Sequence, residues 1–196
     1  MLFAYALLLW RMNRRSDRIF SNKRKKMTGS VTAAHQAAKA TANKKGKYLT
    51  FTLEKEEYGI SIFKIKEIIG MMPVTTVPGT PDFIKGVINL RGKVISVVDL
   101  RLKFSMGSIP YSDRTCIIVV EIDAESGTVP IGIIVDAVSE VLNIREEDTE
   151  DTPAFGTSLD TDYILGMAKI DNSVKILLDI DRVLTADDRA GLKNFS

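Results

Sequence analysis

Cysteine and histidine are almost missing from this chain of 196 residues, which contains one of each, Cys116 and His35. A single cysteine cannot form a disulfide within the chain, and its apolar neighbours predict a buried thiol. His35 lies in the basic N-terminal part, so the rest of the chain lacks the most common general base. The sequence also lacks a Gly-rich phosphate loop, a zinc-spaced cluster and a nucleophile motif. We therefore expect neither a cofactor nor a metal, and a binding module rather than an enzyme.

Long apolar segments are missing as well. Residues 1–10 are apolar, but a membrane-spanning helix needs about 20 such residues. A signal peptide carries its positive charges before the apolar segment, whereas here the basic residues follow it. Three interpretations of this N-terminal part stay open: a solvated tail, a weak membrane-surface attachment, and translation that starts at Met27.

Charge is distributed very unevenly along the chain. Residues 1–47 contain 12 Lys and Arg and one acidic residue, a net charge of +11. Residues 48–196 contain 15 Lys and Arg and 24 Asp and Glu, a net charge of −9. The pattern predicts a basic, disordered extension over residues 1–45 and a folded, acidic domain over residues 46–196. An acidic domain disfavours nucleic acid as a partner.

Helical periodicity is weak, and short β-branched runs alternate with Gly and Pro turns at a spacing of about ten residues. This pattern is typical of small barrels or sandwiches, and it predicts a mostly β fold with short helices. Residues 145–162 are acidic and are expected to form a loop. Thr185 can cap a C-terminal helix over residues 185–193.

The sequence contains an internal repeat. Residues 83–100 align without a gap with residues 163–180, so that Gly86 matches Gly166 and Asp99 matches Asp179. Further upstream, residues 58–69 align with residues 131–142. Two copies about 75 residues apart are too few for a solenoid, which needs about three repeats. We predict two related β modules in tandem, at about residues 48–105 and 112–184.

The first copy of the repeat predicts a hairpin with a charged tip. Residues 91–93, Arg-Gly-Lys, form its turn, and Thr80 is expected to begin a short helical turn that ends at Gly86 with positive φ. Two interpretations of Glu67 and Arg91 stay open: an ion pair that orients the guanidinium, and two independent solvated charges. In the second copy the equivalent residues are Glu140 and Asp171, which would repel each other. We interpret Asp99 and Asp179 as strand ends that make turn hydrogen bonds, rather than as catalytic carboxylates.

Several motifs in this order have a close parallel in one family. They are Phe51-Thr52-Leu53, Glu57-Tyr58-Gly59-Ile60, Phe83-Ile84-Lys85-Gly86-Val87, Asn89-Leu90-Arg91-Gly92, Val98-Asp99-Leu100-Arg101, Gly132-Ile133-Ile134-Val135-Asp136 and Tyr163-Ile164-Leu165-Gly166. Over about residues 46–190 the chain resembles the CheW family of bacterial chemotaxis coupling proteins. The resemblance implies two SH3-like five-stranded β-barrel modules around a hydrophobic seam.

The same resemblance implies a function. Family members are non-catalytic adaptors that join the regulatory domain of the histidine kinase CheA to the cytoplasmic tips of chemoreceptors, the methyl-accepting chemotaxis proteins. The implied location is cytoplasmic, with the membrane reached only through receptor arrays. The implied kinase- and receptor-binding residues are Ile65, Glu67, Val74, Gly86, Arg91, Cys116 and Val141.

Two alternatives stay open at this point. An isolated regulatory domain of the kinase would share the fold, although no ATP-binding or phosphotransfer segment is present in the sequence. An enzyme that uses surface carboxylates is the alternative from a different class. A pull-down with a receptor fragment and kinase, compared with a hydrolase screen, distinguishes these possibilities.

Overall fold

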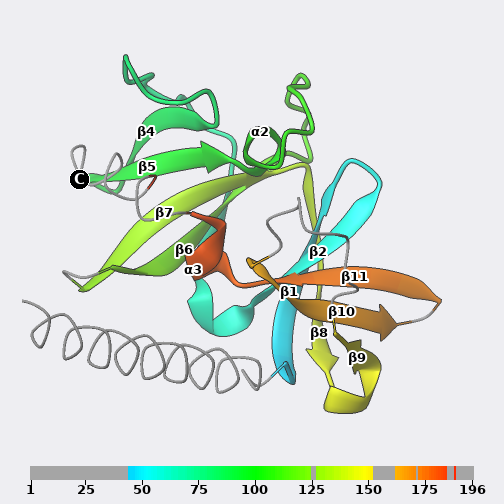
Figure 1. Ribbon diagram of the computed structural model, residues 1–196. Coiled ribbons are helices and arrows are strands. Elements are labelled where there is room, and N and C mark those ends of the chain that lie inside the picture. Colours follow the sequence, from blue (N-terminus) through cyan, green and yellow to red (C-terminus); the bar gives the residue numbers. More distant parts are fainter. Residues whose placement is uncertain (1–43, 125–126, 152–161, 171, 185–187, 189–196) are drawn as a thin grey trace, which may run out of the picture. The chain divides into compact units, whose positions relative to one another are not determined.

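The computed structural model describes residues 44–124, 127–151, 162–170, 172–184 and 188, which belong to one compact unit, Asn43–Ser196. These residues form two β-sheets and only short helices, which confirms the predicted mostly β fold with two β modules (Figure 1). Most of the predicted N-terminal extension and C-terminal helix, together with Asp171, lie outside the described residues.

The six-stranded sheet has the strand order β8-β1-β2-β11-β10-β9. Its strands are β1 (Gly46–Leu53), β2 (Glu56–Ser61), β8 (Ala137–Ile144), β9 (Thr149–Glu150), β10 (Ile164–Ile170) and β11 (Ser173–Leu178). The sixth strand, β9, has only two residues and pairs with β10.

The five-stranded sheet has the strand order β3-β6-β7-β5-β4. Its strands are β3 (Ile65–Gly70), β4 (Ile84–Leu90), β5 (Lys93–Asp99), β6 (Cys116–Ala124) and β7 (Gly127–Val135). Short helices lie between or after strands: η1 (Ile62–Lys64), α2 (Leu100–Lys103), η2 (Glu146–Asp148) and α3 (Ile180–Val183).

Each sheet contains strands from both halves of the sequence. Strand β3 pairs with β6, and β1 pairs with β8. Two further pairs are parallel, β5 with β7 and β11 with β2. Strands far apart in the chain therefore lie side by side (Figure 1). The two sheets therefore do not correspond to the two copies of the sequence repeat, because each sheet takes strands from both copies.

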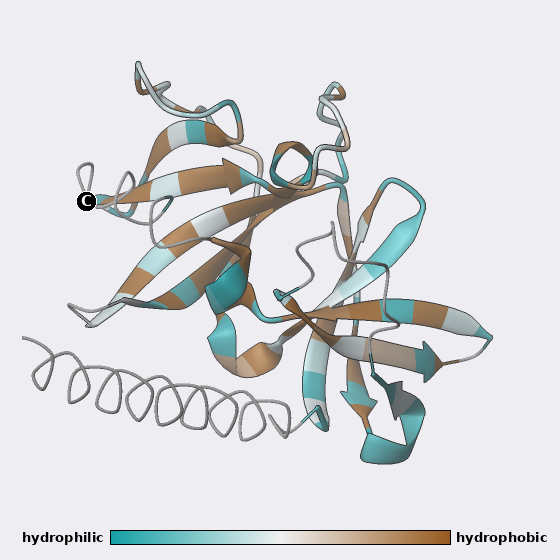
Figure 2. Cartoon of the chain, viewed as in Figure 1, coloured by the Kyte–Doolittle hydropathy of each residue, from teal (hydrophilic) through white to brown (hydrophobic). Residues whose placement is uncertain are grey.

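Three apolar clusters stabilise this arrangement. The largest one lies between the sheets and contains residues from both, among them Phe51 of β1, Val98 of β5 and Ile118 of β6. The opposite face of each sheet has a cluster of its own. Strand β6 contributes to two clusters, because Ile117 and Ile118 point to opposite faces of the strand. Figure 2 shows that apolar residues are frequent in the strands of the five-stranded sheet, whereas strands β1 and β2 of the other sheet are more polar.

The repeat is visible in the geometry. Strands β4 and β10 both shift register at the matching glycine, Gly86 and Gly166. In each copy the aspartate at the end of the following hairpin strand donates its backbone N–H to a carbonyl oxygen before the first strand. Asp99, the last residue of β5, donates to Phe83, and Asp179, directly after β11, donates to Tyr163, both at 2.8 Å. The two hairpins therefore share the register shift and this backbone hydrogen bond, although of the two glycines only Gly86 has a positive φ.

The prediction of a helical turn that extends from Thr80 to Gly86 is wrong. The Ile84 N–H donates to the Pro81 carbonyl, which makes a single turn, and β4 begins at once. Gly86 does have the expected positive φ, +132°, but it lies at a bulge within the strand instead of at a helix end. The predicted turn of residues 91–93 lies at the expected place but is one residue shorter: Arg91 and Gly92 form it, with φ of +53° and +85°, and Lys93 already pairs with Leu90 as the first residue of β5.

One buried hydroxyl carries a stability prediction. Ser96 of β5 is buried, and its Oγ has no hydrogen-bond partner among the described residues. We expect Ser96→Ala to leave the free energy of unfolding unchanged or to raise it by about 1 kcal/mol, because the unpaired polar group is removed. Thr50→Ala is the matched control, since the buried Thr50 Oγ1 bonds the Glu140 backbone at 2.9 and 3.2 Å. Thermal melts that fall equally for both variants would contradict this expectation.

Candidate protein–protein interface

The charged tip of the first hairpin has a defined ion pair. Arg91 Nη2 donates to Glu67 Oε2 at 2.7 Å, and Arg91 Nη1 lies 3.4 Å from Glu67 Oε1. Glu67 is on β3, at one edge of the five-stranded sheet, and Arg91 follows β4 at the other edge. The contact between opposite edges indicates that this sheet curls into a barrel. The Arg91 side chain is 76% exposed, so its guanidinium is held on the surface.

The segment before β4 packs closely against the bulge. Thr75 forms a two-way backbone bridge with Val87 at 2.8 and 2.9 Å. A Cβ atom at Gly86 would lie 2.0 Å from the Thr75 carbonyl oxygen. The neighbouring Val74 is half-buried against the cluster inside this barrel. Gly86 is buried, so its first role is to allow the segment containing Val74 to approach β4.

The thiol of Cys116 is half-buried, which corrects the expectation of full burial. Cys116 pairs with Gly70 of β3 and Val135 of β7. Burial raises the pKa of the thiol, although a hydrogen bond with the Val138 backbone acts in the opposite direction. The raised pKa is not what an activated nucleophile requires.

The remaining two candidates lie on different sheets. Ile65 begins β3 and packs against the cluster between the sheets. Val141 lies on β8, at the edge of the six-stranded sheet, and is 50% exposed. The structure thus brings Glu67 next to Arg91 and places the Val74 segment against Gly86, while Val141 belongs to a second surface.

The carboxylates at the strand ends serve local structure, as predicted. Asp99 Oδ1 accepts from the backbone N–H groups of Arg101 and Leu102, and Asp179 Oδ1 accepts from that of Asp181. The Tyr111 hydroxyl donates to Asp99 Oδ2 at 3.2 Å, and burial together with Asp99 raises the pKa of Tyr111 to about 12.

Sequence reasoning missed one feature of the surface, the exposed Phe63, and one of the region between the sheets, the buried Arg101. Phe63 of η1 is 86% exposed, although its apolar neighbours resemble a core segment. Arg101 is almost completely buried and contacts Asp136 and Glu54. Arg101 and Asp136 occur in the recognised motifs, but nothing in their spacing indicates that they meet.

We predict that Glu67 and Arg91 act as a pair in signalling. An exposed ion pair contributes only about 0–1 kcal/mol to stability, so its value is the orientation of the guanidinium toward a partner. A double-mutant cycle on Glu67→Ala and Arg91→Ala should show coupling in a receptor–kinase assay with little change in melting temperature. The exposed pair Lys169 and Glu150, also at 2.7 Å, is the matched control. Additive effects on signalling would disprove the pairing.

Neither a membrane helix nor a metal site is found in the part of the chain that the structure describes. No helix there is long and apolar enough to cross a membrane. Within the same residues, no group of three or more metal-ligating side chains is found. What these residues present is a pair of packed β-sheets with candidate contact residues on both.

This architecture defines the class as a small, mostly β protein with two packed sheets, and comparisons with known proteins identify the family. The family model for the CheW-like domain matches residues 47–188. The chain is 38% identical over 168 residues to the chemotaxis protein CheW of Klebsiella aerogenes, which covers 86% of this chain and 97% of that protein. The chemotaxis protein CheW of Bacillus subtilis is 34% identical over 139 residues, 70% of this chain and 86% of its own.

A solved structure agrees with these relatives. The crystal structure of the scaffolding protein TtCheW from Thermoanaerobacter tengcongensis is similar, with a TM-score of 0.65 and 38% identity. The similarity covers 74% of this chain and 95% of that chain. The chain therefore belongs to the CheW family of chemotaxis scaffold proteins.

Proposed function

We propose that this protein is a non-catalytic adaptor that couples the cytoplasmic tips of chemoreceptors to the regulatory domain of the histidine kinase CheA. The observation that carries the proposal is membership of the CheW family over residues 47–188. The proposed location is the cytoplasm, at membrane-bound receptor arrays.

The arrangement of the candidate residues supports an adaptor. Val141 lies on the six-stranded sheet. The other six candidates belong to the five-stranded sheet, to the segment after β3 or to the turn between β4 and β5: Ile65, Glu67, Val74, Gly86, Arg91 and Cys116. An adaptor must bind two partners at once, which requires two surfaces that do not overlap. We propose that these seven residues contribute to the kinase- and receptor-binding surfaces.

Co-sedimentation with receptor-containing membranes tests the proposal. We expect the kinase to sediment with the membranes when this protein is added and to stay in the supernatant when it is absent. Sedimentation of the kinase to the same extent without this protein would contradict the proposal. A hydrolase screen of the purified protein is expected to give only background rates, and turnover above background would contradict the non-catalytic part.

A further inference from the structure

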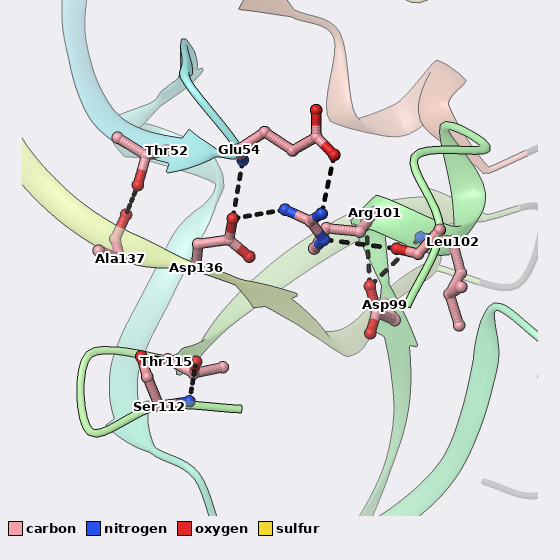
Figure 3. Close-up of polar contacts among 10 residues, drawn as sticks. Thr52, Glu54, Asp99, Arg101, Leu102, Ser112, Thr115, Asp136 and Ala137 are labelled. Atoms are coloured by element: carbon pink, nitrogen blue, oxygen red, sulfur yellow. Dashed lines mark hydrogen bonds and ion pairs between the residues drawn. The ribbon is translucent and has the colours of Figure 1, made fainter. Parts of the chain in front are cut away.

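The Arg101 guanidinium uses all three of its nitrogens in the interior of the domain. Nη1 donates to Asp136 Oδ2 at 2.7 Å, Nη2 donates to Glu54 Oε1 at 2.9 Å, and Nε lies 3.4 Å from the Gly107 carbonyl oxygen (Figure 3). The side chain of Arg101 is only 7% exposed. A buried cation with this set of acceptors has one preferred orientation, because the guanidinium is planar and rigid.

The three contacts of Arg101 come from different parts of the domain. Arg101 itself lies in α2, directly after β5 of the five-stranded sheet. Glu54 lies in the turn between β1 and β2 of the six-stranded sheet. Asp136 is the one residue between β7 and β8, where the chain passes from one sheet to the other. Arg101 therefore connects the two sheets at their crossing point.

Asp136 is itself fixed to the six-stranded sheet. Its backbone N–H donates to the Thr52 carbonyl at 3.1 Å, and its Oδ2 also accepts from the Glu54 N–H at 2.7 Å. The carboxylate that Arg101 contacts is thus held by the first hairpin of the six-stranded sheet (Figure 3). A change in the angle between the sheets would break this network.

A related cluster of one cation and two carboxylates lies at the other crossing, where an aspartate, Asp181, occupies the repeat position of Arg101. Lys64 ends η1, where the chain passes from β2 to β3, and its Nζ lies 2.9 Å from Asp123 Oδ2 and 2.7 Å from Asp181 Oδ2. Asp181 follows Asp179 by two residues, just as Arg101 follows Asp99. The cation at this crossing is more exposed than Arg101 and has no planar fork.

We propose that Arg101 is a positioning residue that sets the orientation of the two sheets relative to each other. Its planar fork binds Asp136 and Glu54 at fixed directions, whereas the single nitrogen of a lysine cannot reproduce this geometry. On the proposed function, this orientation also sets the relative placement of the kinase- and receptor-binding surfaces, since candidate residues lie on both sheets.

The test is an electron-spin distance measurement on the free protein. Spin labels at Val94→Cys in β5 and Val174→Cys in β11, in a Cys116→Ala background, place one label on an exposed position of each sheet. We expect Arg101→Lys to add a second distance or to shift the main one. Arg101→Met should cause a larger shift. If Arg101→Met does not fold, Arg101→Lys alone decides the result.

Lys175→Met is the matched control. Lys175 of β11 is a buried cation that pairs with Glu57 of β2, and both strands belong to the six-stranded sheet. This variant should lower the melting temperature while the spin–spin distance stays unchanged. An unchanged distance in Arg101→Lys, or an equal shift in Lys175→Met, would overturn the proposal.

Partner binding separates this proposal from the proposed function. Arg101→Lys should bind kinase and receptor fragments singly as the parent does, but should lose the complex that contains both. A shifted distance with an intact three-component complex would refute the functional consequence of the orientation. Failure of the parent protein to bind either partner would refute the proposed function and leave the distance result standing.

Discussion

Replacing Gly86 with alanine is expected to lower the free energy of unfolding by about 2–6 kcal/mol, the sum of backbone strain and overpacking. The backbone has φ of +132°, which side chains rarely adopt, and a Cβ would lie 2.0 Å from the Thr75 carbonyl oxygen. The Thr75 carbonyl and the bulge at Gly86 are both parts of the backbone. Neither of them can move away from an added Cβ as the end of a flexible side chain could. Urea unfolding followed by circular dichroism measures the loss.

Alanine substitutions at two other glycines distinguish the contribution of backbone strain from that of overpacking. Gly92 has φ of +85° with nothing within 4 Å of an added Cβ, so Gly92→Ala should cost only strain, about 1–2 kcal/mol. Gly166, the repeat equivalent of Gly86, would place a Cβ 2.8 Å from the Glu150 carbonyl oxygen, and Gly166→Ala should cost about 1–3 kcal/mol. If Gly86→Ala and Gly92→Ala unfold at the same urea concentration, the collision with Thr75 is not the cause.

This result bears on the interpretation of Gly86 as a binding residue. A side chain there would displace Thr75 and with it the neighbouring Val74. Loss of kinase binding in a Gly86 variant therefore indicates a surface contact only if the variant keeps its circular dichroism spectrum and melting temperature. The half-buried Val74 is the better position for a binding test, because Val74→Thr keeps the shape of the side chain.

Asp136→Ala is expected to lower the free energy of unfolding by about 3–5 kcal/mol, because it leaves the buried Arg101 cation without its nearer carboxylate. Asp136 Oδ2 accepts from both Arg101 and the Glu54 backbone, so two donors lose their acceptor at once. Denaturant unfolding with a two-state fit gives the number. Asp136→Asn, which keeps an acceptor oxygen, should cost less than the alanine variant.

Glu54→Ala is the control for this prediction. The Glu54 side chain is 51% exposed, and Arg101 keeps Asp136 when it is removed. The expected cost is about 0–1 kcal/mol, as for a surface pair. A cost for Glu54→Ala as large as that for Asp136→Ala would mean that the two carboxylates share the stabilisation equally, contrary to the difference in burial.

The sequence by itself determined the local elements of this protein. Short apolar runs predicted strands such as β1 and β6, because a strand that is buried on both faces has a nearly continuous apolar sequence. Arg91-Gly92 predicted the hairpin tip, since positive φ in a tight turn is a local requirement. The repeat and the ordered motifs led to the family. The ion pair of Glu67 and Arg91 was one of two open interpretations, and the structure shows it.

Only the tertiary structure decided which strands pair across the two halves of the chain. Strand β3 could have paired with several apolar strands, because hydrophobic pattern sets the buried face of a strand but not its neighbour. The burial of Arg101 could not be predicted either, because its partners lie 35 and 47 residues away in sequence and meet it only in the folded chain. From the sequence, Gly86 was predicted to end a helical turn, because a helix end and a β-bulge can both place a glycine at positive φ. The pairing of β4 with β5, whose register shifts at Gly86, shows that the glycine lies at a bulge within a strand.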